Sequence, residues 1–202
     1  MTEGLIYEQL NTQKGRQCQI DPLSRLENVV LGDAVRVANG VQLLNVAVGS
    51  RTKISRNVTF YSTDAGRPVR LGENCWISFG VFGEGTGGRI EIGDYSVVAH
   101  RTTLLTSSGP GKQSPILEKL YSAEYGSVLV GPHCWIGAHC VVLPGVTLPE
   151  GVVIATHSTV RKACYESWAV YGGSPARLIK RLDRCVIEEA RAELAATVPL
   201  PA

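Results

Sequence analysis

Apolar residues recur at every sixth position along much of this chain. From Val130, the sequence divides into hexads that each begin with Val, Ile or Leu and whose fifth residue is small or β-branched: VGPHCW, IGAHCV, VLPGVT, LPEGVV, IATHST and VRKACY. Four earlier runs, beginning at Leu31, Val48, Leu71 and Ile92, follow the same rule. This period differs from that of a helix and from the two-residue alternation of a strand.

The period predicts a short strand followed by a turn, with three such units closing one triangular coil. The first-position aliphatic side chains then stack inside the prism, where fifth positions must be small because the corners are narrow. Such a coil buries its apolar column only by stacking on neighbouring coils. A β-sandwich with fortuitous spacing is the alternative, and the long uninterrupted run of hexads disfavours it. The pattern therefore predicts an all-β solenoid of hexapeptide repeats.

Several segments flank or interrupt the repeats. Residues 1–28 are predicted to form an irregular cap with one short helix, and residues 29–175 the solenoid. Residues 106–127 (TSSGPGKQSPILEKLYSAEYGS) form an excursion loop, and the Gly-rich FGEGTGGRI at 82–90 forms a shorter bulge. Residues 176–202 are predicted to form a C-terminal helix and tail, because ARLIKRLDRCVIEEARAELAA has helical spacing. This helix is expected to plug the open end of the prism.

Composition and charge exclude several functional classes. The net charge is +2 and 19% of the residues are charged, which gives no strong field for binding nucleic acid or a membrane surface. No run approaches the roughly 18 apolar residues that span a bilayer. The six cysteines form no CxxC pair and follow no signal peptide, so reduced thiols and a cytoplasmic location are expected.

Three stretches carry a resemblance to a known family: WIGAHCVVLPGV, GVVIATHSTVRK and GGSPARLIKR. With them the chain resembles the hexapeptide-repeat acyltransferases of the maltose, galactoside and polysaccharide O-acetyltransferase type, over about residues 69–182. The resemblance implies a left-handed parallel β-helix, a homotrimer with active sites between subunits, and acetyl-CoA as the donor. The acceptor it implies is a hydroxyl of a sugar or polysaccharide precursor, with an amine as the alternative.

The resemblance also implies which residues contact the acceptor and the donor, with Trp135 as a substrate-binding residue. Trp135, in the WIG stretch, matches a tryptophan that lines the family's cleft, although packing against a neighbouring subunit also explains it. Ala155 and Thr156 stand where the family has GAGS, whose small side chains let pantetheine approach the backbone. Basic residues near the end of the solenoid are expected to pair with the CoA phosphates, or else to form a solvated face: Arg161, Lys162, Arg177, Lys180 and Arg181.

Acyl transfer to a hydroxyl needs a general base, most often a histidine. In the family this histidine lies at the start of the excursion, in stretches such as YTATHP, whereas LLTSSGP places Gly109 there and residues 104–127 contain no histidine. Three alternatives stay open. Another group acts as base, the acceptor is an amine, or the chain has lost catalysis and binds a partner through the excursion. His100 is the predicted catalytic residue, with Glu118 and Glu124 as further candidates.

Hydroxyls and imidazoles supply the remaining candidate chemistry. Ser107 and Ser108 are predicted substrate-binding residues, because their hydroxyls can donate to the oxyanion or to the acceptor, although serine is also common in turns. His133, His139 and His157 occupy fourth hexad positions and raise the alternative of a zinc hydratase of the γ-class carbonic anhydrase type. The spacing of His133 and His139 does not match that family. Fourth positions point outward, so surface histidines are the preferred interpretation and no metal is expected.

Overall fold

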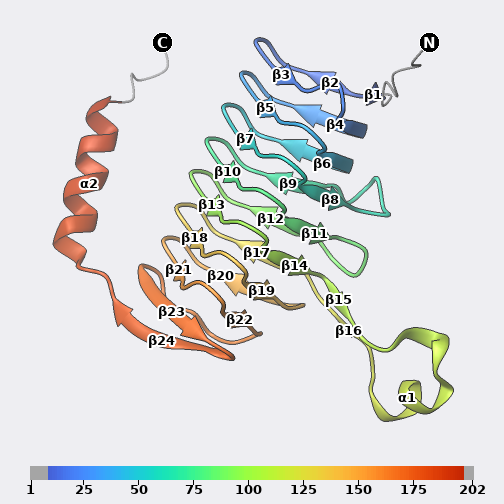
Figure 1. Ribbon diagram of the computed structural model, residues 1–202. Coiled ribbons are helices and arrows are strands. Elements are labelled where there is room, and N and C mark those ends of the chain that lie inside the picture. The colour runs from blue at the N-terminus through green and yellow to red at the C-terminus, as the bar shows by residue number, and fades with distance from the viewer. Residues whose placement is uncertain (1–8, 198–202) are drawn as a thin grey trace.

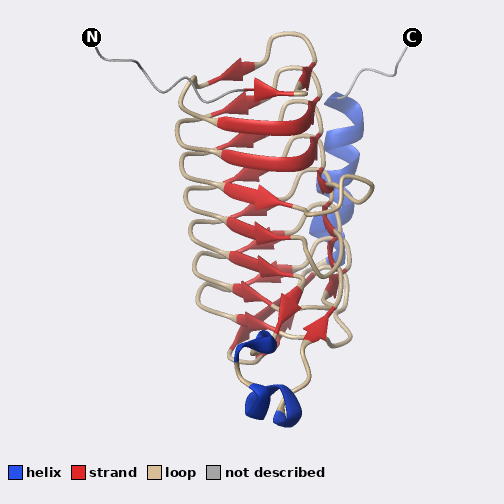
Figure 2. Cartoon of the chain, turned by 90° about the vertical axis from the view of Figure 1, so that its right-hand side faces the viewer, coloured by secondary structure: helices blue, strands red, loops and turns tan. Residues whose placement is uncertain are grey.

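The computed structural model describes residues 9–197 and shows a prism of stacked parallel coils (Figure 1). Each coil adds short strands to flat faces that are joined by tight turns and loops (Figure 2). The three faces are named here after one strand of each: the β7 face, the β8 face and the β9 face. The structure confirms the predicted fold class, an all-β solenoid that is a left-handed parallel β-helix of hexapeptide repeats.

The β7 face is one nine-stranded sheet within the described residues. Its strands are parallel and one coil apart, except for an antiparallel hairpin at the C-terminal end. In chain order they are β3 (Gln19–Ile20), β5 (Arg36–Val37), β7 (Lys53–Ile54), β10 (Trp76–Ile77), β13 (Val97–Val98), β18 (Trp135–Ile136), β21 (Val153–Ile154), β23 (Ala169–Gly173) and β24 (Ala176–Arg181).

The β8 and β9 faces form one continuous sheet, because β4 (Arg25–Leu31) and β6 (Gln42–Val48) run through the corner between them. The β8 face continues with β8 (Thr59–Tyr61), β11 (Phe82–Glu84), β14 (Thr103–Leu105), β19 (Val141–Val142) and β22 (Thr159–Val160). The β9 face continues with β9 (Val69–Leu71), β12 (Ile90–Ile92), β17 (Val128–Val130) and β20 (Thr147–Leu148). β1 (Gln9–Leu10) and β2 (Gln13–Lys14) pair with β4.

The aliphatic first positions of the hexads form the core, as predicted. Ile136, Val142 and Leu148 are successive first positions, and each is at most 1% exposed. Parallel strands lie about 4.8 Å apart, so each inward side chain packs on its equivalent in the next coil. The fifth-position residues Cys134 and Cys140 are also buried, and each thiol donates to a backbone carbonyl oxygen. The narrow corners are thus filled by small side chains.

The solenoid begins earlier than the sequence pattern predicts. The described part of residues 1–28 contains strands β1 to β4 and no helix, which corrects the predicted irregular cap; residues 1–8 lie outside the described residues. Ile20 is aliphatic like its register partner Val37, whereas Lys14 occupies the position that is in register with the aliphatic Leu31. Lys14 is exposed because it lies at the open end of the prism, where an aliphatic side chain has no coil above it to pack against. The hexad pattern is therefore lost in the first coil.

An asparagine ladder turns the chain at the corner between the β8 and β9 faces in the first coils. Asn11, Asn28 and Asn45 all have positive φ angles, between 50° and 54°. The side-chain amides of Asn11 and Asn28 each donate to the next asparagine at 3.1 Å, and Asn45 donates to the carbonyl oxygen of Ser62 at 2.7 Å. Asparagine tolerates this backbone region better than most residues, and the ladder satisfies its side chains.

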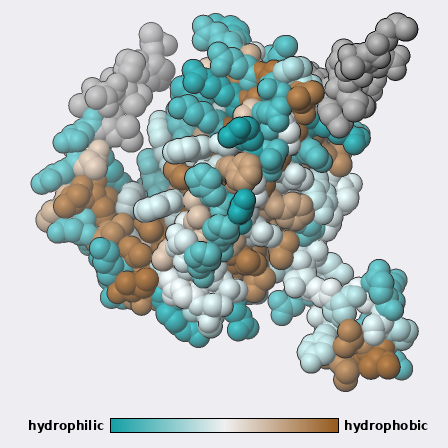
Figure 3. Space-filling view, viewed as in Figure 1, coloured by the Kyte–Doolittle hydropathy of each residue, from teal (hydrophilic) through white to brown (hydrophobic). Residues whose placement is uncertain are grey.

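The excursion leaves the solenoid at this same corner, between β14 and β17. Its stem is an antiparallel pair, β15 (Ser107–Ser108) and β16 (Glu124–Tyr125), and its tip holds a 3-10 turn (Gly111–Gln113) and the short helix α1 (Pro115–Leu120). The Ser114 side chain caps α1 by accepting from the backbone N–H of Leu117. Apolar side chains gather at the tip (Figure 3), where Ile116 and Leu120 are 72% and 67% exposed.

The C-terminal segment differs from the predicted helix over 176–202. Residues 176–181 are strand β24, which folds back on β23, and helix α2 begins only at Arg184 and ends at Thr197. β23 offers unpaired backbone groups at the end of the sheet, and pairing with β24 satisfies them, which outweighs the helical spacing of this segment. The helix runs along the outside of the coils instead of plugging the prism (Figures 1 and 2). Arg191 anchors it through an ion pair with Glu150 at 2.6 Å.

No helix within residues 9–197 is long and apolar enough to cross a membrane.

One core position breaks the aliphatic rule and yields a prediction. On the β8 face, Gly83 lies in register between Phe60 and Leu104, and a Cβ at Gly83 would overlap the Phe60 ring. Overpacking of this kind typically costs about 1–3 kcal/mol. We expect Gly83→Ala to lower the melting temperature. Adding Phe60→Leu should recover part of this loss, because the smaller side chain leaves room for the new Cβ. A double variant as unstable as the sum of the two single variants would contradict this account of the packing.

Candidate active site

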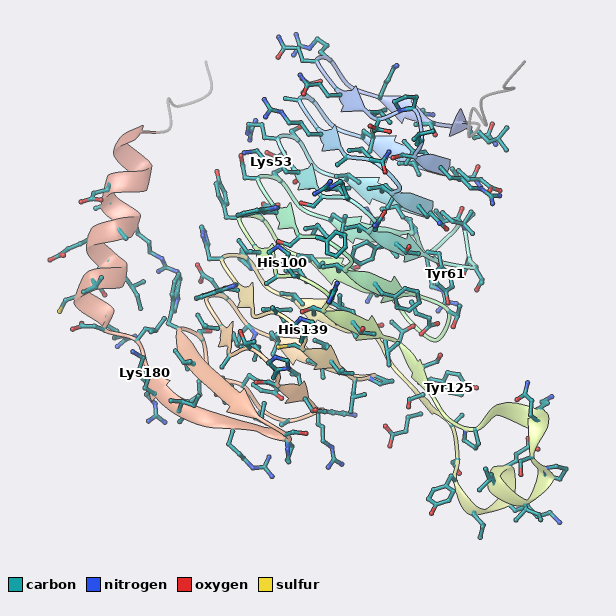
Figure 4. The ribbon with its side chains drawn as sticks, viewed as in Figure 1. Lys53, Tyr61, His100, Tyr125, His139 and Lys180 are labelled. Atoms are coloured by element: carbon teal, nitrogen blue, oxygen red, sulfur yellow. The ribbon has the colours of Figure 1, made fainter. Side chains whose placement is uncertain are left out.

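Three histidines follow one another along a single edge of the prism. His100, His139 and His157 lie in the turns after β13, β18 and β21, at the corner between the β7 and β8 faces, which is named here the histidine corner. The rings of His139 and His157 stack with centroids 5.0 Å apart, and the backbone N–H of His139 donates to the carbonyl oxygen of His100. All three side chains are exposed. Figure 4 labels His100 and His139 along the coils, below Lys53.

The histidine corner is also narrow and lined by small residues. Ala155 and Thr156, predicted to contact the donor, form the turn before His157. A Cβ at Gly137 would lie 2.6 Å from the backbone nitrogen of Thr156, and one at Gly172 would lie 3.0 Å from Cβ of Ala155. Because Gly137 and Ala155 carry at most one side-chain carbon, an extended ligand can approach the backbone at these turns. The structure thus brings Ala155 and Thr156 onto the same edge as His100.

Two tryptophans stand on the β7 face beside this corner. Trp135 is 53% exposed and Trp76 is 50% exposed. Val97 lies between them in register, so the two indoles are two strands apart on the same face. Neither ring is needed to fill the core, because both point outward from the prism. Trp135 is thus the register partner of Val97, whose strand leads into the turn of His100.

The predicted serines lie on a different edge. Ser107 and Ser108 form β15, at the corner between the β8 and β9 faces, which is named here the excursion corner. The Ser107 hydroxyl donates to Oε2 of Glu84 at 3.1 Å. Ser108 is exposed and pairs with Glu124 of β16, one of the alternative bases. Within one chain, the serines and His100 are thus on separate corners of the prism.

The predicted phosphate-binding cations are also divided. Arg161 and Lys162 follow β22 and line a hollow at the excursion corner, whereas Arg177, Lys180 and Arg181 lie on the terminal hairpin. Arg181 makes a two-pronged ion pair with Glu166 at 2.7 and 2.8 Å, and this contact lowers the pKa of that carboxyl. Arg177 and Lys180 are exposed on β24.

The position of the missing histidine is closed to side chains. A Cβ at Gly109 would lie 2.7 Å from both Cα and Cβ of Ala123, on the opposite side of the excursion. Real Cβ atoms do not approach backbone this closely, so any larger residue here requires the stem to move apart. The other candidate in the excursion, Glu118, is exposed on α1.

The metal alternative finds little support in the arrangement of the histidines. His133 lies at the third corner, where its ring stacks on Tyr95 with centroids 5.1 Å apart, away from His139 and His157. Among residues 9–197, no group of three or more His, Cys, Asp or Glu side chains is placed to hold a metal ion.

The buried cysteines are poor nucleophiles, because burial raises the pKa of Cys134 to about 11.

A buried carboxylate that sequence reasoning missed holds the base of the excursion. Glu84 is 6% exposed, and its Oε2 accepts from the backbone N–H groups of Thr106 and Ser107 at 3.2 and 3.1 Å. Its Oε1 accepts from the backbone N–H of Thr86 at 2.7 Å and from the Thr86 hydroxyl. Burial, and to a lesser extent the charge of Glu84, raises the pKa of Tyr61. One charge therefore ties the bulge after β11 to the first residues of the excursion.

Removing this charge should loosen the excursion. Glu84→Ala removes the carboxylate acceptor of the part-buried N–H groups of Thr86 and Ser107, whereas the N–H of Thr106 keeps the backbone carbonyl oxygen of residue 84. Leaving a buried donor unsatisfied typically costs about 1–3 kcal/mol. We expect a lower melting temperature and faster proteolysis within residues 106–127, with Glu84→Gln intermediate because its amide oxygen still accepts. The control is Glu91→Ala, since within residues 9–197 the Glu91 side chain forms only a surface ion pair with Arg89. Equal proteolysis of the excursion in Glu84→Ala and the control would contradict this assignment.

Comparisons with known proteins agree with this architecture. The family described as bacterial transferase hexapeptide (six repeats) matches residues 127–162. A dTDP-4-amino-4,6-dideoxy-D-glucose acyltransferase from Escherichia coli is 30% identical over 164 residues, which cover 70% of this chain and 85% of the relative. A chloramphenicol acetyltransferase from Agrobacterium fabrum is 41% identical over 59 residues, covering 29% of this chain and 28% of the relative.

A solved structure extends the likeness of fold over almost the whole chain. The N-acyltransferase AntD from Bacillus cereus, in complex with dTDP and 3-hydroxybutyryl-CoA, superposes with a TM-score of 0.66 at 20% identity, covering 93% of this chain and 92% of AntD. Together with the coils, the small-residue turns of the histidine corner and the extent of the Escherichia coli match, these comparisons settle the family. The chain belongs to the hexapeptide-repeat acyltransferases.

Proposed function

We propose that this chain transfers an acyl group from acyl-CoA to the amino group of a nucleotide-linked amino sugar. The proposal revises the expectation of a hydroxyl acceptor. The Escherichia coli relative that matches over most of its length is named for a dTDP-linked amino sugar, and the Bacillus cereus neighbour is an N-acyltransferase in complex with dTDP and an acyl-CoA. Both support an amine acceptor over a hydroxyl.

The observation that carries the proposal is the closed position of Gly109. A hydroxyl needs a strong base during attack on a thioester, and this site has no room for the family histidine because Ala123 occupies the space. An amine is different, since its deprotonated form attacks directly and then needs only to lose a proton. A site that positions an amine correctly can therefore work without a histidine in the excursion.

The reaction balances with residues of the histidine corner. The amine nitrogen forms a bond to the thioester carbonyl carbon, the carbon–sulfur bond breaks, and CoA leaves as the thiolate, which becomes the thiol by taking up the proton that the nitrogen loses. We assign His100 to accept the proton that the nitrogen loses, because it lies exposed on the same edge as the small-residue turn of Ala155 and Thr156. Those turns let the pantetheine arm lie close to the backbone, and the exposed Trp135 ring borders the arm on the β7 face.

In the proposed site, the donor phosphates and the excursion belong to different subunits. Arg177 and Lys180 lie at the C-terminal end of the β7 face, where we place the CoA phosphates. We infer a homotrimer in which the excursion of one subunit covers the histidine corner of the next. Its exposed apolar tip, with Ile116 and Leu120, fits burial against another subunit. This arrangement would bring Ser107, Ser108, Arg161 and Lys162 of one subunit close to the donor on its neighbour.

A matched pair of acceptors tests the proposed function. We expect kcat/KM for a dTDP-linked 4-amino sugar to exceed that for its 4-hydroxy counterpart by at least about 100-fold, because only the amine attacks without a strong base. The readout is thiol release from acetyl-CoA together with the mass of the product. Equal rates on the two acceptors, or a preference for the hydroxyl, would show that the amine assignment is wrong.

His100→Ala tests the proton acceptor separately. General-base assistance is worth about 10²–10⁴-fold, and the amine needs only part of it. We expect kcat to fall by about 10- to 100-fold at pH 7, at or below the lower limit of that range, while KM for acetyl-CoA stays unchanged. The loss should shrink as pH rises, because hydroxide then removes the proton. His133→Ala is the matched control at the third corner and should keep full activity. A His100→Ala variant as active as the control would remove His100 from the mechanism.

A further inference from the structure

The N-terminal half of the β7 face is hollowed into a groove that none of the predicted site residues lines. The groove encloses about 720 Å³ between β3, β5, β7 and β10. Small-molecule sites in proteins commonly have about 300–1,000 Å³. The groove lies on the same face as Trp135, toward the opposite end of the solenoid from the hairpin that carries Arg177 and Lys180. It therefore has the size and position of a second substrate subsite.

The charge of this groove has one sign. Arg36, Arg51 and Lys53 line it, and no carboxylate does. Arg51 is already engaged by Glu73 at 2.7 Å, whereas neither Arg36 nor Lys53 makes a side-chain hydrogen bond or ion pair within the described part of the chain. Arg36 and Lys53 are exposed register partners on adjacent strands, about 4.8 Å apart. Because their backbones are only one strand spacing apart, these two free side chains can both reach one diphosphate group.

The next strand adds an aromatic ring. Trp76 is the register partner of Lys53, and its Nε1 donates to the Ser55 hydroxyl at 3.2 Å, which orients the half-exposed indole. An exposed indole offers an apolar surface for the face of a sugar ring. A ligand whose diphosphate rests on Arg36 and Lys53 therefore meets this surface one strand further along the β7 face.

The register also fixes the distance from the cations to the proposed reaction centre. Val97 follows Trp76 in the sheet, and its strand β13 leads directly into the turn of His100. Lys53 is thus two strand spacings, about 10 Å, from the row that carries His100. A single sugar ring with its bond to phosphate covers most of this distance, and the long side chains of Arg36 and Lys53 can cover the rest. The donor approaches the same row from the other side, past Trp135.

We propose that Arg36 and Lys53 bind the diphosphate of a nucleotide-linked acceptor, with the sugar ring packed against Trp76 and its amino group held at the row of His100. The nucleoside then extends beyond Arg36 toward β3. This assignment rests on the proposed function for the identity of the sugar. It goes further by placing the acceptor on a surface remote in sequence from the excursion and by identifying the groups that recognise its phosphates.

Calorimetry on the intact chain tests the subsite without any acyl transfer. The probes are dTDP and inorganic pyrophosphate, titrated into the wild type, Arg36→Gln, Lys53→Gln and Arg70→Gln. Arg70 is the matched control, because it is an exposed arginine on β9, on another face, and has no ion pair within the described residues. Arg36→Gln and Lys53→Gln should each weaken dTDP binding about tenfold, the usual effect of losing one charge-assisted contact. Arg70→Gln should bind dTDP as tightly as the wild type, and the affinity for CoA should be unchanged in all variants.

The outcomes separate this inference from the proposed function. Absence of binding by both probes, or equal loss in Arg70→Gln, would overturn the subsite. Trp76→Ala should raise KM for the linked amino sugar and leave dTDP affinity almost unchanged, since the indole contacts the sugar. Acylation of a free amino sugar with the same KM as the linked one would contradict the diphosphate subsite but still support an amine acceptor. Binding of dTDP through Arg36 and Lys53, with transfer only to hydroxyls, would support the subsite but contradict an amine acceptor.

Discussion

The parallel register of the coils is the constraint on which the rest of this structure depends. Because first-position aliphatic side chains such as Ile136 and Ile154 must stack inside the prism, each strand is locked to its neighbour without slippage. Every outward side chain is then placed in steps of about 4.8 Å along a face. A functional site on this scaffold is built from rows, and the distance between two groups follows from the number of strands that separate them.

The corners of the prism differ in their side chains and in the insertions that they carry. The histidine corner is narrow and lined by small residues, which suits an extended ligand that lies along it, whereas every long insertion leaves at the excursion corner. Glu84 anchors the largest insertion with a buried charge, so the excursion starts from a fixed base although its tip is exposed. In one chain the two edges do not meet, so we propose that the excursion of a second subunit completes the site.

The sequence predicted those parts of the molecule in which local pattern and tertiary packing agree. The hexads from Val130 correctly predicted the core and the fold class, and they predicted that Cys134 and Cys140 are buried at the corners. Prediction was wrong where tertiary pairing overrides local spacing: β24 is a strand because the sheet end needed a partner, although its residues have helical spacing. It was also wrong where an open end removes the need for an aliphatic side chain, as at Lys14.

The candidate site was less predictable, because its residues are related by register and not by sequence distance. Arg36, Lys53 and Trp76 are separated by unequal intervals along the chain, yet they occupy adjacent positions on the β7 face. Nothing in the sequence marks Glu84 as buried.

A crystal structure with CoA and dTDP bound together tests the central claim most directly. We expect the CoA sulfur at the row of Val97, between Trp76 and Trp135, with the diphosphate on Arg36 and Lys53. A sulfur elsewhere, or a diphosphate off the β7 face, would contradict it.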